Sequence, residues 1–332
     1  MKICVFGAGA IGGHVAGRLA KGGADVSLVL RGANLTAIRE KGLEVRAADG
    51  VLHSRPKASA HPAELGVQDA VIVTVKAPAL ASVAASIAPL LGPNTAVAFV
   101  MNGIPWWYFD KHGGPMDGRR LEQVDPGNAL REAVGVDRTI GGVVYSACTV
   151  IEPGIVNVAS ATNRVILGEL DGGISPRAKA IAAILEAGGM SAPVAEDIRK
   201  EVWGKLMGNL SGGPLCLLSR RTIAETLSDP AVLAAAIRMT DEGGAIAAAL
   251  GRDVGMGGAE RVGRSLKTFH KPSILQDLEL GRPMEVEALF RLPLELARMT
   301  GVATPTLDLA IALATHAAIA AGLYTPLAGK AV

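Results

Sequence analysis

The chain has 332 residues, which is enough for two domains of ordinary size. Its 33 basic and 31 acidic residues leave a net charge of +2, and this balance argues against a surface that binds nucleic acid or an anionic membrane, because both need clustered Lys and Arg. The three cysteines lie far apart and without metal-ligand spacing, so they predict buried free thiols in a reducing compartment and no metal site.

No stretch of the sequence reaches the roughly 18 to 20 uninterrupted apolar residues that a membrane helix needs. The apolar start of the chain is broken by glycines within a few residues, so it is typical of a strand and a loop and not of a secretion signal. We therefore expect a soluble, cytoplasmic protein with neither a membrane nor a nucleic-acid partner. A homodimer is a possible assembly.

The first predicted elements are a strand, a glycine-rich turn and a helix. The strand stops at the run Gly7-Ala8-Gly9-Ala10-Ile11-Gly12, which has the G-x-G-x-x-G spacing. In this spacing the first glycine permits a tight turn, the second lets the backbone approach a pyrophosphate, and the third lets the helix lie close to the strand. These six residues are predicted to hold the phosphates of a dinucleotide on the free N–H groups of the helix. A glycine-rich turn without a ligand is the alternative.

A second predicted strand, residues 26–30, ends in Arg31. An NAD-specific site would place an acidic residue near this position to bind the ribose 2′-hydroxyl. An arginine instead favours a 2′-phosphate, and therefore NADP. An ordinary solvated charge at a strand end is the alternative interpretation.

Two further strands, residues 69–75 and 96–100, are predicted to be buried on both faces, because their apolar runs are unbroken. Lys76 follows the first strand directly, and Asn102 lies two residues beyond the end of the second. Strands that alternate with helices indicate a doubly wound, mainly parallel sheet, whose ligands bind beyond the carboxyl ends of the strands. Three more runs, at 140–150, 155–158 and 164–168, are expected to add strands to this sheet.

Residues 105–128 interrupt the alternation with four consecutive aromatic residues, 106–109, and a Gly-rich polar stretch. A loop of this length inside a compact domain is usually functional or mobile. A hydrophobic plug that covers a sheet edge or a subunit contact is an equally weighted alternative.

After a predicted helix at 175–188, the chain becomes rich in alanine and leucine and is predicted to be helical from Asp197 onward. The sequence therefore predicts an α/β fold with an N-terminal Rossmann domain, residues 1–194, and an all-helical C-terminal domain, residues 195–332. Lys205 and Asn209 are four residues apart on one face of the first long helix.

The order of short motifs along nearly the whole chain resembles the ketopantoate reductase (2-dehydropantoate 2-reductase) family. Besides the glycine run and Arg31, the motifs are V-K-A at 75–77, N-G at 102–103, P-G at 153–154, W-x-K-L-x-x-N at 203–209, S-x-L-Q-D at 273–277 and R-x-x-E at 282–285. The resemblance implies that the active site lies in the cleft between the two domains and that a 2-oxo acid is reduced with NADPH.

The resemblance also implies roles for individual residues. Lys205 matches the catalytic lysine of the family, and Glu285 matches its active-site glutamate. Substrate-contacting positions match Asn102, Asn209 and Ser273, and positions near the adenosine part of NADP match Arg31 and Lys76. Asn102 is also expected to contact the cofactor.

The chemistry fits these residue types. Hydride addition to a ketone builds negative charge on the oxygen, so the site needs a cation that also donates a proton, such as the ammonium of Lys205. Ser273 follows a proline at a helix start, where its hydroxyl and free N–H groups suit a carboxylate. The alternatives are a solvated helix lysine, a capping serine and, for Glu285, an acid placed to suit a helix dipole.

One position departs from the family pattern. The family commonly has a second asparagine four residues after the first, where this chain has Gly213. Restoring an asparagine there is expected to improve ketopantoate binding. The main interpretation is an NADPH-dependent reductase of 2-dehydropantoate in pantothenate synthesis. The alternatives are a paralogous reductase of another 2-oxo acid and a non-catalytic NADP-binding regulator.

Overall fold

The computed structural model describes residues 1–160 and 163–327, and the chain divides into two compact units. The first unit comprises Met1–Met101 and Trp106–Ile198, and the second comprises Asn102–Pro105 and Arg199–Val332. The short segment 102–105 therefore groups with the second unit, although its neighbours on both sides in the sequence belong to the first.

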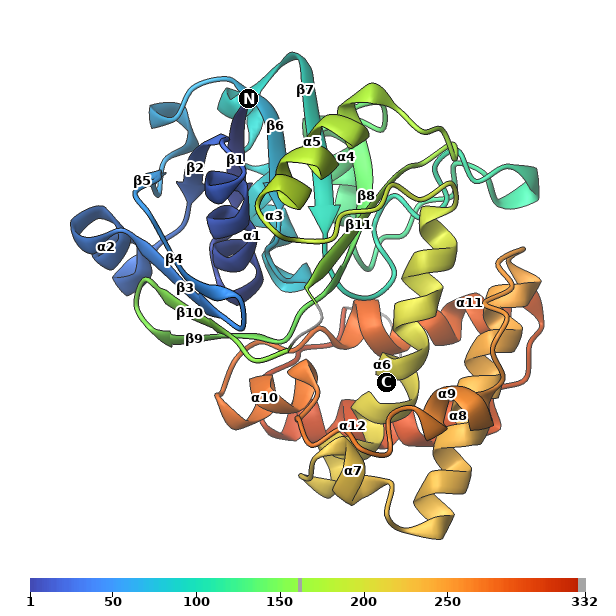
Figure 1. Ribbon diagram of the computed structural model, residues 1–332. Coiled ribbons are helices and arrows are strands. Elements are labelled where there is room, and N and C mark those ends of the chain that lie inside the picture. The colour runs from blue at the N-terminus through green and yellow to red at the C-terminus, as the bar shows by residue number, and fades with distance from the viewer. Residues whose placement is uncertain (161–162, 328–332) are drawn as a thin grey trace. The chain divides into compact units, whose positions relative to one another are not determined.

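The first unit is built on a large, mainly parallel sheet, as the alternation of strands and helices predicts (Figure 1). Among the described residues its strands are, in spatial order, β11 (Arg164–Glu169), β8 (Thr139–Tyr145), β7 (Leu91–Val100), β6 (Gln68–Val73), β1 (Lys2–Phe6), β2 (Asp25–Val29) and β5 (Lys57–Ser59). All neighbouring pairs are parallel except β11 with β8. The Rossmann prediction for this part of the chain is thus confirmed.

Among the described residues of this unit, three α-helices have 10 to 12 residues and two have five. They are α1 (Ala10–Lys21), α2 (Gly32–Lys41), α3 (Leu80–Ala84), α4 (Ala129–Ala133) and α5 (Pro176–Ala187), with 3₁₀ turns η1 (Pro62–Glu64), η2 (Ala77–Ala79), η3 (Ala88–Leu90), η4 (Gly114–Met116) and η5 (Pro126–Asn128). Ser175 caps α5 by accepting a hydrogen bond from the N–H of Ala178. The helix therefore starts where the sequence predicts it to start.

One expectation about the strands was wrong. The runs at 140–150 and 155–158 do not all extend the large sheet, because the first run splits into β8 and β9 (Cys148–Glu152). A second sheet has the order β4 (Gly50–Ser54), β3 (Leu43–Ala47), β10 (Ile155–Val158) and β9. It packs on α1, where a Cβ at Gly13 or Gly17 would lie 2.7 Å from Val156 or Val45. Strand propensity predicts that a run is extended, whereas the sheet that the strand joins depends on packing against distant elements such as α1.

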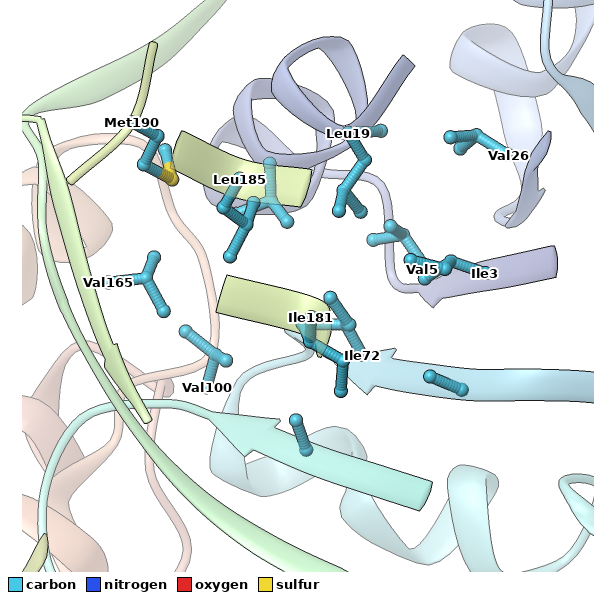
Figure 2. Close-up of a cluster of buried hydrophobic side chains, with 14 of the residues drawn as sticks. Ile3, Val5, Leu19, Val26, Ile72, Val100, Val165, Ile181, Leu185 and Met190 are labelled. Carbon is cyan, nitrogen blue, oxygen red and sulfur yellow. The ribbon is translucent and has the colours of Figure 1, made fainter. Parts of the chain in front are cut away.

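The core of the first unit lies between the large sheet, α1 and α5. Figure 2 shows Leu19 of α1 with Ile181 and Leu185 of α5, gathered around Val5 and Ile72 of the central strands. These side chains are fully or almost fully buried, and burial of each contributes about 1.5–3 kcal/mol. This packing holds α1 against the sheet, and the helix begins at Ala10, within the glycine run and directly after its N-cap Gly9.

The aromatic segment covers the other face of the large sheet. Trp106, Trp107, Tyr108 and Phe109 are at most 2% exposed. The ring of Trp106 meets Phe99 of β7 edge-on with centroids 5.5 Å apart, and Trp107 packs so closely on β8 that a Cβ at Gly141 would lie 2.6 Å from its ring. The segment is therefore part of the packed core. It is buried and apolar, as the plug interpretation expected, but its rings pack on β7 and β8, which are not edge strands.

All regular secondary structure among the described residues of the second unit is helical (Figure 1). Its helices are α6 (Ile198–Ser219), α7 (Ile223–Thr226), α8 (Pro230–Ala249), α9 (Gly258–Gly263), α10 (Ser273–Glu279), the π-helical turn η6 (Glu287–Arg291), α11 (Leu292–Thr300) and α12 (Pro305–Ala320). Glu242 of α8 caps α12 by accepting hydrogen bonds from the N–H groups of Thr306 and Leu307. No helix among the residues that the structure describes is both long and apolar enough to cross a membrane.

Candidate functional site

The glycine run forms a turn in which each glycine has its own physical requirement. Gly7 has a φ of +98°, which a side chain would strain, and a Cβ at Gly12 would lie 2.3 Å from the carbonyl oxygen of Gly7. Gly9 differs from both, since no described atom lies within 4 Å of its Cβ position. The backbone at Gly9 is therefore bare on a side where a ligand can approach it.

The start of α1 leaves donors available for an anion. The first N–H groups of a helix have no acceptor within it, and Gly9 as N-cap has no side chain to supply one. The first turn, which begins Ala10-Ile11-Gly12, also holds no acidic residue. Together with the positive end of the helix dipole, these features make the turn a suitable site for a phosphate.

The predicted partners of the dinucleotide lie at the same edge of the sheet. Phe6, the last residue of β1, pairs with Val29 of β2 on one side and with Val73 of β6 on the other. Arg31 follows β2 and Lys76 follows β6, so the two cations flank the glycine run. Arg31 is exposed and makes no hydrogen bond or ion pair with any residue that the structure describes.

In the second unit, Lys205 and Glu285 are brought together from positions 80 residues apart. Burial lowers the pKa of Lys205 from its ordinary value of 10.5 to about 8, and the negative charge of Glu285 acts in the opposite direction. Glu285 itself is only 4% exposed and precedes η6. The pair combines a proton donor whose pKa lies near neutrality with a buried carboxylate.

The remaining predicted residues lie on elements packed around the same part of this unit. Asn209 is one turn beyond Lys205 on α6, and Ser273 is the exposed first residue of α10. A Cβ at Gly213 would lie 3.7 Å from Ile274 of α10. This contact places the start of α10, and therefore Ser273, beside the helix that carries Lys205 and Asn209.

Asn102 belongs to the segment 102–105, which is hydrogen-bonded to η6. Its neighbour Ile104 donates its N–H to the carbonyl oxygen of Ala288 at 2.9 Å. The side-chain oxygen Oδ1 of Asn102 is buried and has no hydrogen-bond partner among the described residues. A buried acceptor without a donor is costly in a finished core, so this atom is a candidate to receive a hydrogen bond from a ligand.

Glu287 is already engaged by other side chains. It accepts a hydrogen bond from the hydroxyl of Tyr324 and lies 3.7 Å from Arg291, which also donates to the Tyr324 hydroxyl at 3.0 Å. Burial is the largest of the effects that raise the pKa of Tyr324, so the phenol keeps its proton for this bond. Glu287 thus links Tyr324, which follows α12, to η6, and Glu285 is the carboxylate that interacts with Lys205.

The cysteines give no second reactive centre. Cys4 and Cys216 are buried, and Cys148 is half-buried with its sulfur 3.3 Å from Nδ1 of His14. Arg18 donates from Nε to Nε2 of His14, so the neutral imidazole carries its proton on Nδ1 and donates it toward Cys148. His14 therefore does not act as a base for this thiol, whose pKa burial raises to about 12. Within residues 1–160 and 163–327, no cluster of His, Cys, Asp or Glu is arranged to hold a metal ion.

Comparison with known proteins identifies the family to which these features belong. The family described as "Ketopantoate reductase PanE/ApbA" matches residues 3–172, and its C-terminal part, "Ketopantoate reductase PanE/ApbA C terminal", matches residues 197–318. A 2-dehydropantoate 2-reductase from Mesorhizobium japonicum is 44% identical over 328 residues, which cover 98% of this chain and 100% of that protein. The chain belongs to the ketopantoate reductase family.

Solved structures of similar proteins agree with the ketopantoate reductase fold. A crystal structure of a putative ketopantoate reductase from Ralstonia solanacearum superposes with a TM-score of 0.90 at 39% identity, covering 97% of this chain and 99% of that one. A D-mandelate dehydrogenase in a ternary structure with NADH and anilino(oxo)acetate has a TM-score of 0.80, with 98% and 100% of the two chains covered. At 21% identity, the second likeness shows the fold alone.

Two features of this ketopantoate reductase family member are beyond what sequence reasoning found. A Cβ at Gly213 would lie 3.0 Å from Cε1 of Phe290, so an aromatic ring occupies the space beside the position where the family commonly has asparagine. An asparagine at 213 would therefore require this ring to move by a few tenths of an ångström, and the expected gain in ketopantoate binding stays a prediction. Phe290 reads as an ordinary core residue, and no motif marks it. The other feature is Pro293 of α11, which has no N–H and so cannot donate a hydrogen bond to a carbonyl of the preceding turn η6.

Proposed function

We propose that the protein reduces a 2-oxo acid with NADPH and that its substrate is 2-dehydropantoate, which it converts to pantoate in the synthesis of pantothenate. The observation that carries this proposal is the electrostatic pairing of Lys205 with Glu285 in a chain of the ketopantoate reductase family. A reductase of this kind needs a hydride donor, a proton donor and groups that orient the oxo acid.

The first unit has the groups that would hold NADPH. The pyrophosphate would lie on the bare backbone of Gly9 and the first N–H groups of α1, and Arg31 would bind the 2′-phosphate, with Lys76 on the other side of the turn. NADPH, when bound, supplies the hydride that reduces the carbonyl carbon.

Lys205 would supply the proton. As the carbonyl carbon is reduced, negative charge grows on its oxygen, and an ammonium at Nζ both stabilises that charge and gives up a proton to it. A pKa of about 8 suits this role, because the group is protonated at neutral pH yet gives up its proton more readily than an ordinary lysine does. Glu285 limits the fall in that pKa and so keeps Lys205 charged.

The substrate would be oriented by amide and hydroxyl groups. Asn102 offers its Oδ1, which accepts no hydrogen bond from any described residue. Asn209 adds donors and acceptors without charge, and Ser273 offers its hydroxyl at a helix start to a carboxylate. The hydroxyl of 2-dehydropantoate would donate to Glu285. Because a buried partner left without its hydrogen bond is costly, this contact would discriminate against analogues that lack the hydroxyl.

A second candidate substrate is a less polar 2-oxo acid. The observation that favours it is the contact between Gly213 and Phe290, which places an aromatic ring beside the position where the family commonly has an amide. The deciding experiment measures NADPH and NADH oxidation by the purified protein with a panel of 2-oxo acids that includes 2-dehydropantoate. If the protein prefers a hydroxyl-free acid, that acid takes the place of 2-dehydropantoate as the proposed substrate. If it turns over no acid, the result favours a regulatory NADP-binding protein.

Replacing Arg31 by alanine is expected to narrow the preference for NADPH over NADH, mainly by raising the Michaelis constant for NADPH. A guanidinium forms charge-assisted hydrogen bonds with a 2′-phosphate that a ribose hydroxyl cannot match. Steady-state kinetics with both cofactors measure the ratio. Arg55→Ala, which removes another exposed arginine of the first unit, should leave the ratio unchanged. An unchanged ratio in the Arg31 variant would contradict the role of that residue.

Replacing Gly213 by asparagine alone is expected to lower stability by about 1–3 kcal/mol, the usual cost of overpacking, because its Cβ would lie 3.0 Å from Phe290. Thermal unfolding measures this loss. Combining the change with Phe290→Leu should recover part of the stability and lower the Michaelis constant for 2-dehydropantoate relative to Phe290→Leu alone. If the double variant binds this substrate no better than Phe290→Leu does, position 213 has no part in binding it.

A further inference from the structure

The turn η6 leaves one of its carbonyl groups without a partner in the helix. Leu292 donates its N–H to Glu287, five residues earlier, which is the π-helical pattern. In an α-helix this N–H would go to Ala288, and the π pattern would instead give Ala288 the N–H of residue 293. Residue 293 is a proline and has none. The carbonyl of Ala288 is therefore available to another part of the chain.

The segment 102–105 supplies a hydrogen-bond donor for this carbonyl. Ile104 donates its N–H to the Ala288 oxygen at 2.9 Å, and a Cβ at Gly103 would lie 2.5 Å from the same oxygen. Gly103 also has a φ of +79°, in the left-handed region. The contact thus requires glycine for two independent reasons, its backbone conformation and its closeness to η6.

The same turn also fixes Glu285. The carbonyl of Glu285 accepts the N–H of Leu289 at 3.1 Å, so Glu285 is hydrogen-bonded to η6. The same turn is hydrogen-bonded to Ile104 through the carbonyl of Ala288. Asn102 directly precedes Gly103, and its buried Oδ1 has no partner among the described residues. One short helical turn therefore sets the backbone beside both Asn102 and Glu285.

We propose that the hydrogen bond from Ile104 to Ala288 positions Asn102 for contact with the oxo acid; this inference rests on the proposed function. Pro293 leaves the Ala288 carbonyl without a donor in the helix, and Gly103 allows the close approach that the bond needs. Gly103 and Pro293 are positioning residues that act through Asn102. Catalytic groups must be held to a fraction of an ångström, and a displacement of about 1 Å costs on the order of 10²-fold in rate.

The kinetic test compares Asn102→Ala, Gly103→Ala and the double variant. Gly103→Ala is expected to lower kcat/KM about as much as Asn102→Ala does, roughly 10- to 100-fold, and the double variant should be no more than about twofold worse than either single variant. Gly255→Ala is the matched control, because Gly255 has a φ of +68° in the same unit but no described atom within 4 Å of its Cβ position. It should keep near-wild-type activity. If the effects of the two single variants multiply, Gly103 does not act through Asn102 and the inference is wrong.

A second test does not depend on activity. Pro293→Ala supplies the missing N–H, so Ala288 gains a partner within the helix and the amide of Ile104 should exchange with solvent at least tenfold faster by residue-resolved hydrogen exchange. Unchanged protection of that amide would overturn the role of Pro293. If the wild-type protein reduced no oxo acid, the proposed function would fail, and this exchange result would still show whether Pro293 governs the contact.

Discussion

Replacing Lys205 by alanine is expected to lower kcat about 10²-fold or more, the usual scale for loss of a general acid. The ammonium stabilises charge that develops only in the transition state, so kcat and kcat/KM for the oxo acid should fall together. Binding of NADPH, measured by fluorescence titration, should barely change. Lys200→Ala removes an exposed lysine of the same helix and serves as the control.

The pH dependence gives the same residue a second signature. Because the pKa of Lys205 lies at about 8 and the protonated form is the donor, kcat/KM should fall as pH rises through about 8. The unfolded chain titrates this lysine near 10.5, so between these values it holds more protons than the folded chain, and the free energy of unfolding should rise with pH. Lys205→Met should lack this rise. A variant with near-wild-type turnover would remove the lysine from the mechanism.

Replacing Glu285 by glutamine should lower kcat/KM for 2-dehydropantoate by roughly 10- to 100-fold, since a hydrogen bond to a charged group contributes about 1.5–3 kcal/mol. The loss should be smaller for a 2-oxo acid without a hydroxyl, so discrimination between the two substrates should narrow. Removing the carboxylate charge should also lower the pKa of Lys205, and the alkaline fall in rate should move to lower pH.

The two readouts of this variant separate two roles of Glu285. Lost discrimination without a moved pH profile would assign the carboxylate to the substrate hydroxyl alone, and the reverse would assign it to Lys205 alone. Glu279→Gln, an exposed glutamate on the preceding helix, is the control. If neither discrimination nor the pH profile changes, Glu285 is not an active-site residue and the assignment of 2-dehydropantoate loses its main support.

Much of the first unit follows from local patterns in the sequence. The apolar runs within β1, β6 and β7 and the glycine spacing at the start of α1 predict a parallel sheet with a phosphate turn, because burial on both faces and glycine conformation are properties of the residues themselves. The place of β9 and β10 in a separate sheet does not follow in this way. It depends on the close approach of α1 at Gly13 and Gly17, which involves residues distant in the sequence.

The sequence by itself determined the residue types of the candidate site and, through the order of its motifs, the family. Only the tertiary structure decided that burial lowers the pKa of Lys205 against the charge of Glu285, and that Phe290 lies beside Gly213. It alone also showed that the aromatic segment 106–109 is core, and that Ala288 holds the segment that begins at Asn102. Solvation and steric contact depend on which distant residues come together, and local spacing carries no record of that.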